Sequence, residues 1–294
     1  MYQEEKIKNH LAYINESRKS TGTNVKPYLA IAQPRRNAKE KAAQKFPNDK
    51  LKFGTFLNHY SSIYLWTDGQ LVDTARNTLC DEAIKHDAKY IFFIGEDTVV
   101  PYTAFLDLHI LAEANPDAVV SGVYYFKGGE PMVFVKDADG YLKTANVDRG
   151  QVIENPLLIG IDVMLIPVKI LKELKEKEKG CPLFCIVGED NVWHDGAFIG
   201  EDEWFIKLLY KHNYRILVTT DVQCLHMDLA TGNYTAHDSV NLDDYVCQIP
   251  PNRRLTSKDR EYLDKRWSSR IPEPKLKVEK NNFQLKKEII NLTQ

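Results

Sequence analysis

Short apolar runs alternate with amphipathic stretches along most of the chain, and this pattern predicts the secondary structure. The runs are five to nine residues long and predict buried strands at 27–32, 62–66, 89–94, 118–125, 158–166 and 215–219. Apolar positions that recur every three or four residues predict helices that begin at Asp73 and Pro101, and helices at 168–178 and 201–212. Strands and helices that alternate in this way are typical of an α/β sandwich with a mostly parallel sheet.

Local signals refine some of these elements. Asp73 is expected to be a helix N-cap, because its carboxylate can accept a hydrogen bond from a free backbone N–H group. Pro101 is expected in the first turn of its helix. The residues 138–140 read Ala-Asp-Gly between two short strand patterns, 132–135 and 141–144, and predict a hairpin. The strand at 215–219 is expected to be the last.

An acidic pair follows the central strand directly. Ligands of such folds bind at the carboxyl ends of the strands, so the loops after Ala32, Trp66, Ile94 and Thr219 are where chemistry is expected. Glu96 and Asp97 come just after Ile94. Adjacent carboxylates repel unless a cation or hydrogen-bond donors offset their charge, and a divalent metal that holds a diphosphate would do so. The alternative is an ordinary acidic loop with a helix cap.

Two other segments carry residues of the same kind. His226 follows the last predicted strand, and oxygen ligands with one imidazole suit Mn²⁺ better than Ca²⁺. Glu201, Asp202 and Glu203 open a helix, where the helix dipole favours acids. A carboxylate held ionised there could act as a general base on a hydroxyl group. A structural histidine and simple capping acids are the alternatives.

Together these segments resemble the GT-A glycosyltransferases, especially the family 2-like group, over about residues 27–228. Gly95-Glu96-Asp97 resembles the Asp-x-Asp metal motif, with glycine at its first position. The same group is suggested by four further segments: VDTARN at 72–77, SGVYYFK at 121–127, GEDEWF at 200–205 and DVQCLH at 221–226. The resemblance implies a GT-A (Rossmann-like) α/β/α sandwich.

The resemblance also implies roles for particular residues. The implied metal ligands are Asp97 and His226 with Glu96, for Mn²⁺ or Mg²⁺, and the implied base is Asp202 or Glu201. The residues implied to line the donor site are Ala32, Pro34, Arg35, Asp68, Arg76, Asn77, Glu96, Tyr124 and Lys127. Asp162 stands where the group usually has a small residue, and its side chain is expected to point into the cleft that binds the acceptor.

Composition limits the other possibilities. The chain has 294 residues, 43% of them hydrophobic, and a net charge of −2, which disfavours global disorder and a nucleic-acid partner. The longest nearly apolar run, 157–168, has twelve residues, against about 20 for a membrane span. With no signal-peptide pattern and five scattered cysteines, a cytoplasmic protein is expected.

Three regions are expected: an extension at 1–26, a catalytic domain at 27–250 and a tail at 251–294. The tail holds twelve Lys or Arg against six Asp or Glu, which leaves a net −8 on the residues before it. It is either a solvated segment or a basic patch for an anionic membrane surface or a partner.

The predicted function is metal-dependent transfer of a sugar from a nucleotide-diphospho-sugar to a hydroxyl of a glycan, a lipid-linked acceptor or a protein. Inversion of the anomeric configuration follows if the base acts opposite the leaving group. A sugar-nucleotide nucleotidyltransferase is the nearest enzymatic alternative, although the loop after the first strand lacks the glycines typical of that class. A non-catalytic nucleotide-sugar-binding module is the other, and Gly95 in the metal motif is its best support.

Overall fold

The structure is a computed structural model, and it describes residues 27–35, 62–101, 104–126, 129–140, 142–187, 200–227 and 234–235. The predicted extension at 1–26, the predicted tail at 251–294 and Lys127 lie outside the described residues. None of the helices in the described part has the length and apolar character needed to cross a membrane.

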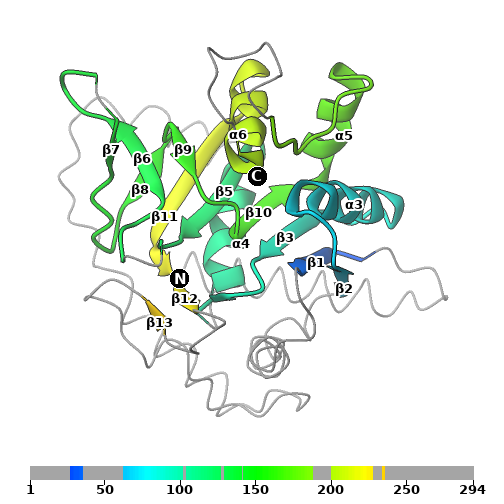
Figure 1. Ribbon diagram of the computed structural model, residues 1–294, viewed down its shortest axis with the longest axis horizontal. Helices are drawn as coiled ribbons and strands as arrows, with labels where there is room; N and C mark the ends of the chain where they lie inside the picture. Colours follow the sequence, from blue (N-terminus) through cyan, green and yellow to red (C-terminus); the bar gives the residue numbers. More distant parts are fainter. Residues whose placement is uncertain are drawn as a thin grey trace, which may run out of the picture. The chain divides into compact units, whose positions relative to one another are not determined.

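A seven-stranded sheet forms the centre, in the order β2-β1-β3-β10-β5-β11-β8 (Figure 1). Its strands are β1 Leu29–Arg35, β2 Ser62–Asp68, β3 Tyr90–Ile94, β5 Ala118–Val123, β8 Val152–Glu154, β10 Val163–Pro167 and β11 Arg215–Gln223. Strands β2, β1, β3, β5 and β11 share one direction, and only β10 and β8 oppose it. The predicted mostly parallel sheet is therefore confirmed.

Helices cover both faces of this sheet, as an α/β sandwich requires. They are α3 Val72–Lys85, α4 Ala104–Ala114, α5 Val168–Lys177 and α6 Glu201–Lys211. The apolar residues of α3, α5 and α6 pack with one face of the sheet, and those of α4 pack with the other. Neighbouring residues of a strand alternate between the two cores: Phe93 belongs to the first and Phe92 to the second. This burial on both faces explains why the strands read as continuous apolar runs.

The apolar run 158–166 was predicted to be one strand, and this is wrong. It divides into β9 Leu158–Ile159, which pairs with β6 (Val133–Lys136), and β10, which enters the central sheet. The chain changes sheets at Gly160, where a Cβ atom would lie 2.9 Å from both Met132 Sδ and Tyr124 Cδ1. The predicted hairpin is present as β6 Val133–Lys136 and β7 Leu142–Thr144.

Both predicted helix starts are displaced. Helix α3 begins at Val72, and Leu71 is its N-cap, so Asp73 lies inside the first turn and not at the cap. Its carboxylate accepts a hydrogen bond from Thr74 N at 2.7 Å, and an acid in the first turn is favoured by the helix dipole. Pro101 precedes α4, and its carbonyl accepts from Ala104 N at 2.9 Å.

A small second sheet, β13-β12-β4, was not predicted. It consists of β4 Thr98–Val99, β12 Leu225–Met227 and β13 Tyr234–Thr235. The strand predicted at 215–219 as the last is β11, which extends to Gln223 and is followed by β12 and β13. In the register of β4 and β12, His226 lies opposite Thr98. This pairing ties the segment after β11 to the loop after β3.

A polar network lies at the amino ends of β1 and β3. The Tyr28 hydroxyl is 2.6 Å from Nε2 of the buried His109. The Tyr90 hydroxyl and the Lys89 ammonium donate to Glu113 at 2.6 and 2.8 Å. The carboxyl ends of the same strands carry the candidate site, so the two polar groups occupy opposite edges of the sheet.

Candidate functional site

The structure brings Asp97 and His226 together. Asp97 lies in the turn between β3 and β4, and β12 carries His226 to the same place through its pairing with β4. His226 Nε2 is 3.1 Å from Asp97 Oδ2, and the side chains are 7% and 24% exposed. Glu96, the third predicted ligand, precedes Asp97 in the same turn and is half-buried.

The tautomer of His226 follows from its contacts. Nδ1 lies 2.8 Å from the Tyr125 carbonyl, which can only accept, so Nδ1 carries the proton and donates. In the neutral ring the lone pair is then on Nε2, and it faces the Asp97 carboxylate and the Tyr124 hydroxyl, which is 3.2 Å away. This is the arrangement that fixes metal-ligating histidines, with one nitrogen bound to a carbonyl and the other directed at the metal.

A carboxylate oxygen and an imidazole lone pair that face each other repel unless a cation lies between them. A proton serves this purpose in part: burial lowers the pKa of His226, but hydrogen bonding and charge from Asp97 outweigh it and raise that pKa. A divalent ion fits as well, because two adjacent ligands on an octahedral ion, each about 2.1 Å from it, are about 3 Å apart. Within the described ranges no group of three or more His, Cys, Asp or Glu side chains could by itself hold a metal ion. Asp97 and His226 would therefore hold an ion together with ligands from a substrate or water.

A second cluster centres on Arg76, which α3 presents. Its Nη1 donates to Glu201 Oε1 at 2.8 Å and to the Asp202 carboxylate, and its Nη2 donates to Asp162 Oδ1 at 2.9 Å. Arg76 is 3% exposed, and the three acids are 17–20% exposed. The guanidinium also lies over the ring of Phe184, 5.8 Å from its centroid.

The charges in this cluster act on one another. Burial alone would lower the pKa of Arg76, but the three carboxylates raise it above its usual value, so it stays a cation. Burial raises the pKa of Asp202 to about 6, with further upward contributions from Asp162 and Glu201 that Arg76 opposes. A carboxylate with a pKa near 6 is mostly ionised at neutral pH and is basic enough to accept a proton.

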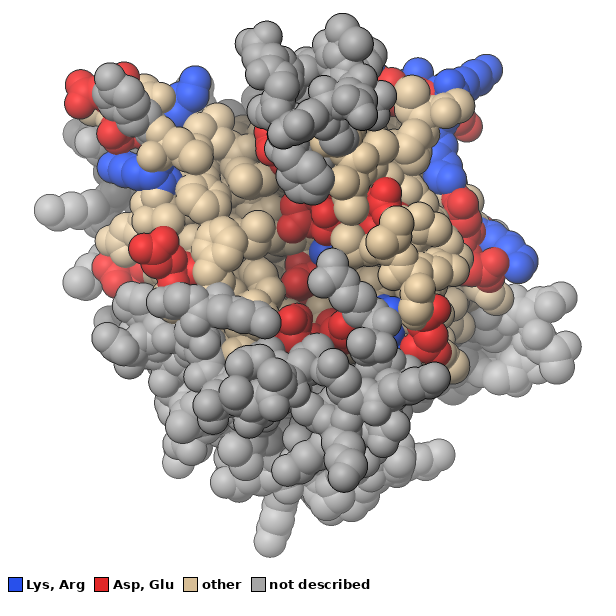
Figure 2. Space-filling model, viewed as in Figure 1, with Lys and Arg blue, Asp and Glu red and all other residues tan. Residues whose placement is uncertain are grey.

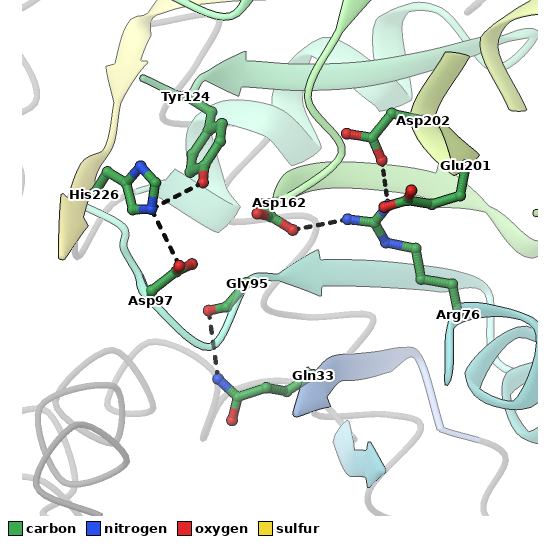
Figure 3. Close-up of polar contacts among 9 residues, drawn as sticks. All are labelled: Gln33, Arg76, Gly95, Asp97, Tyr124, Asp162, Glu201, Asp202 and His226. Carbon is green, nitrogen blue, oxygen red and sulfur yellow. Dashed lines mark hydrogen bonds and ion pairs between the residues drawn. The ribbon is translucent and has the colours of Figure 1, made fainter. Parts of the chain in front are cut away.

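Asp162 lies between the two clusters (Figure 3). It directly precedes β10, and because β10 is antiparallel to β3 and β5, its beginning lies at the edge where those strands end. A Cβ atom on Gly95 would lie 2.7 Å from Asp162 Cγ and 2.8 Å from Oδ2. The Asp162 carboxylate therefore occupies the space beside Gly95 that a side chain at position 95 would fill.

The end of β1 adjoins this region through Gln33, whose Nε2 donates to the Gly95 carbonyl at 3.5 Å. The predicted donor residues Ala32, Pro34, Arg35 and Asp68 lie at the ends of β1 and β2, where Arg35 is opposite Asp68. The Arg35 guanidinium lies 5.6 Å from the ring centroid of Trp66, which is 53% exposed. This polar and aromatic edge continues the candidate site beyond Asp97 and His226.

Asn77 has a scaffolding function here. Its Nδ2 donates to the Phe184 carbonyl at 2.6 Å and to the Asp73 carbonyl at 2.9 Å. Its Oδ1 accepts from Leu183 N and Phe184 N at 3.0 and 3.1 Å. The side chain of Asn77 thus fixes the segment at 183–184 to the start of α3.

The candidate site is acidic. Figure 2 shows acidic side chains near the middle of one face of the molecule, with little basic surface between them. Asp97, Asp162, Glu201 and Asp202 face Arg76 and His226, so the carboxylates outnumber the cations. An anionic ligand such as a diphosphate requires an added cation to bind among them.

Two features of the site were not predicted. The first is the contact of Arg76 with Glu201 and Asp202. These acids lie 125 and 126 positions after Arg76 in the sequence, so no local pattern indicates the contact. The second is Gln33. A polar residue near the end of an apolar strand was the one sign in the sequence that could have indicated it. Asp162 binds Arg76 and lies beside Gly95, and its expected place on the acceptor side stays a prediction.

The described part is thus an α/β sandwich that gathers acids, arginines and a histidine at the edge of its sheet where the parallel strands end. No protein-family model and no curated protein matches the sequence. Solved structures that are similar to this chain include the following two. A197 from STIV has a TM-score of 0.48 and 18% identity, over 76% of this chain and 99% of that one. GalNAc-T7, solved with UDP, GalNAc and Mn²⁺, has a TM-score of 0.46 and 10% identity, over 82% of this chain. This chain spans about half of that protein, 48%. At these values neither neighbour assigns a role to a residue here.

Proposed function

We propose that this protein is a GT-A glycosyltransferase that transfers a sugar from a nucleotide-diphospho-sugar to a hydroxyl acceptor, with a divalent metal. The observation that carries the proposal is the 3.1 Å approach of His226 Nε2 to Asp97 Oδ2, with the ring oriented by the Tyr125 carbonyl. Two segments separated by 129 positions meet there in the geometry of two adjacent metal ligands. The order of sequence motifs that resembles GT-A enzymes supports the same function.

Asp97 and His226, with Glu96 nearby, would hold Mn²⁺ or Mg²⁺. When bound, such an ion offsets negative charge on a diphosphate leaving group. The donor nucleotide would lie along the ends of β1 and β2, near Ala32, Pro34, Arg35 and Asp68, where the Arg35 guanidinium can contact phosphate or stack on a base. Tyr124 stays protonated, because burial and the nearby carboxylates of Asp162, Asp97 and Asp202 raise its pKa. It can therefore donate a hydrogen bond at the boundary between the metal pair and the acids.

Asp202 is the proposed general base, with Glu201 as the alternative. Asp202 lies at the start of α6, where the helix dipole favours the ionised form, and its pKa near 6 leaves it able to accept a proton at neutral pH. The acceptor hydroxyl would approach Asp202 and attack the anomeric carbon as the nucleoside diphosphate leaves. The proton of the hydroxyl passes to Asp202, and inversion follows if this attack is opposite to the leaving group.

The test is a screen of UDP-, GDP- and dTDP-sugars for release of the nucleoside diphosphate, with and without Mn²⁺. We expect one donor class to be hydrolysed slowly in the presence of Mn²⁺, and Asp97→Asn to abolish the reaction. Asp81→Asn is the matched control, because Asp81 is an exposed acid of α3 that pairs with Lys175. Binding without turnover and without metal would instead identify a non-catalytic module, and formation of a nucleotide sugar from a nucleoside triphosphate would identify a nucleotidyltransferase.

A further inference from the structure

Arg76 is a buried cation surrounded by acids from two separate segments. Glu201 and Asp202 belong to the first turn of α6, and Asp162 precedes β10. The guanidinium contacts all three carboxylates and is 3% exposed. Its Nε is also buried and has no hydrogen-bond partner among the described residues. The orientation of the guanidinium therefore follows the carboxylates and does not satisfy every donor.

The same part of α3 also fixes the helix that carries two of these acids. Asn77, the neighbour of Arg76, binds the backbone of Phe184 through both ends of its amide. The Phe184 ring stacks on Phe205 of α6, with centroids 4.5 Å apart. Phe205 lies one helical turn after Glu201 and Asp202. Arg76 thus contacts the first turn of α6 directly, and Asn77 supports the same helix through Phe184.

We propose that Arg76 is a positioning residue, which holds Glu201 and Asp202 in place and keeps Asp202 ionised for proton transfer. This inference rests on the proposed function in naming proton transfer as the purpose. The contacts of Arg76 and its effect on the ionisation of Asp202 can be tested whether or not the protein transfers a sugar. A bidentate guanidinium suits this task, since it can bind several carboxylates in fixed directions.

The ionisation of Asp202 depends on the balance of its neighbours. The charged and titratable groups around it are Arg76 from α3, Glu201 on its own helix, Asp162 before β10 and Tyr124 just after β5. Two of these are acids and only Arg76 is a cation. Without the guanidinium, burial and the like charges of Glu201 and Asp162 would act unopposed and favour the protonated form.

The experiment measures the ionisation of Asp202 directly, by a ¹³C NMR titration of carboxyl-labelled full-length protein, with the signal assigned through Asp202→Asn. In Arg76→Met we expect the midpoint to rise by about one pH unit or more, a tenfold change in proton affinity. In Arg76→Lys we expect a midpoint close to that of the wild type, because the charge remains. The matched control is Arg215→Met, which removes a partly exposed arginine paired with Glu154, and it should leave the midpoint unchanged.

A steady-state measurement separates position from charge. In Arg76→Lys, kcat should fall at least tenfold while the pH dependence of kcat/KM stays the same, because a lysine cannot hold two acids in the same directions. An unchanged Asp202 midpoint in folded Arg76→Met, or an unchanged kcat in Arg76→Lys, would overturn the proposal. If Arg76→Met does not fold, Arg76→Lys decides through kcat. If the NMR midpoint shifts but the wild type hydrolyses no nucleotide sugar, the proposed function fails and the role of Arg76 in keeping Asp202 ionised stands.

Discussion

Replacement of Gly95 by alanine gives a sharp test of how the two clusters are joined. The new Cβ would lie 2.6 Å from Thr98 Oγ1, 2.7 Å from Asp162 Cγ and 2.8 Å from Asp162 Oδ2, whereas an ordinary contact is 3.4 Å or more. The neighbours would have to move by about 0.7 Å. Thr98 is fully buried in β4, and Asp162 is held by Arg76, so neither moves freely. Overpacking of this kind costs about 1–3 kcal/mol.

The assay is urea denaturation of Gly95→Ala, Asp162→Ala and the double variant, which together form a thermodynamic cycle. Because Asp162 supplies two of the three close contacts, Gly95→Ala should cost about 1 kcal/mol less when Asp162 is already alanine. Gly200→Ala is the matched control, since a Cβ there meets nothing within 4 Å and the backbone φ is −71°. If the two single effects simply add, Asp162 does not occupy the space beside Gly95 in solution.

Three further outcomes are expected. Asp202→Asn should lower kcat by about 10²–10⁴-fold with donor binding unchanged, and wild-type kcat/KM should rise as the pH increases through about 6; near-normal turnover of the variant would exclude Asp202 as the base. Titration calorimetry with UDP present should show Mn²⁺ binding more tightly as the pH rises, because the metal displaces a proton from His226, whose pKa Asp97 raises against the effect of burial; His226→Ala should abolish both the binding and its pH dependence. Urea denaturation of the wild type and of His109→Gln should show that the stability contributed by His109 falls as the pH drops below about 6.5, since burial lowers the pKa of His109 and the unfolded chain then takes up the proton. Stability should fall further below about pH 4.5, where Glu113, whose pKa is lowered chiefly by its hydrogen bond with His109, becomes protonated on unfolding; Glu113→Gln should remove this second decline, and an unchanged acid profile would contradict the assignment.

The long strands and the helices could be predicted because each carries its own signal. Strands buried on both faces read as apolar runs, and the periodicity of the helices reflects one buried side. Strands of two or three residues, such as β4 at 98–99 and β12 at 225–227, are too short to show any period. The run at 158–166 hid a change of sheet at Gly160, because apolar character alone does not reveal where a chain bends.

The candidate site was predictable in its residue types and less so in its contacts. An acid or histidine that follows a predicted strand can be placed in advance, because the carboxyl ends of parallel strands share one edge of the sheet. Asp97 and His226 were placed in this way, and they meet at that edge. The partners of Arg76 lie 86 to 126 positions away, and they meet it only because the fold brings the start of α6 and the residue before β10 to α3. Long-range packing of this kind leaves no pattern in a single sequence.

The reversed direction of β10 has a consequence for recognising related proteins. Since β10 starts where β3 ends, an acidic side chain can reach the same point either from position 95 or from position 162. The two side chains would occupy the same space, so an acid at one position excludes a large side chain at the other. Relatives are therefore expected to carry an acid at the alignment column of Gly95 or at that of Asp162, with a small residue at the other. A profile that demands an acid in a single column would discard some members as inactive, and a three-dimensional template of carboxylate positions would retain them.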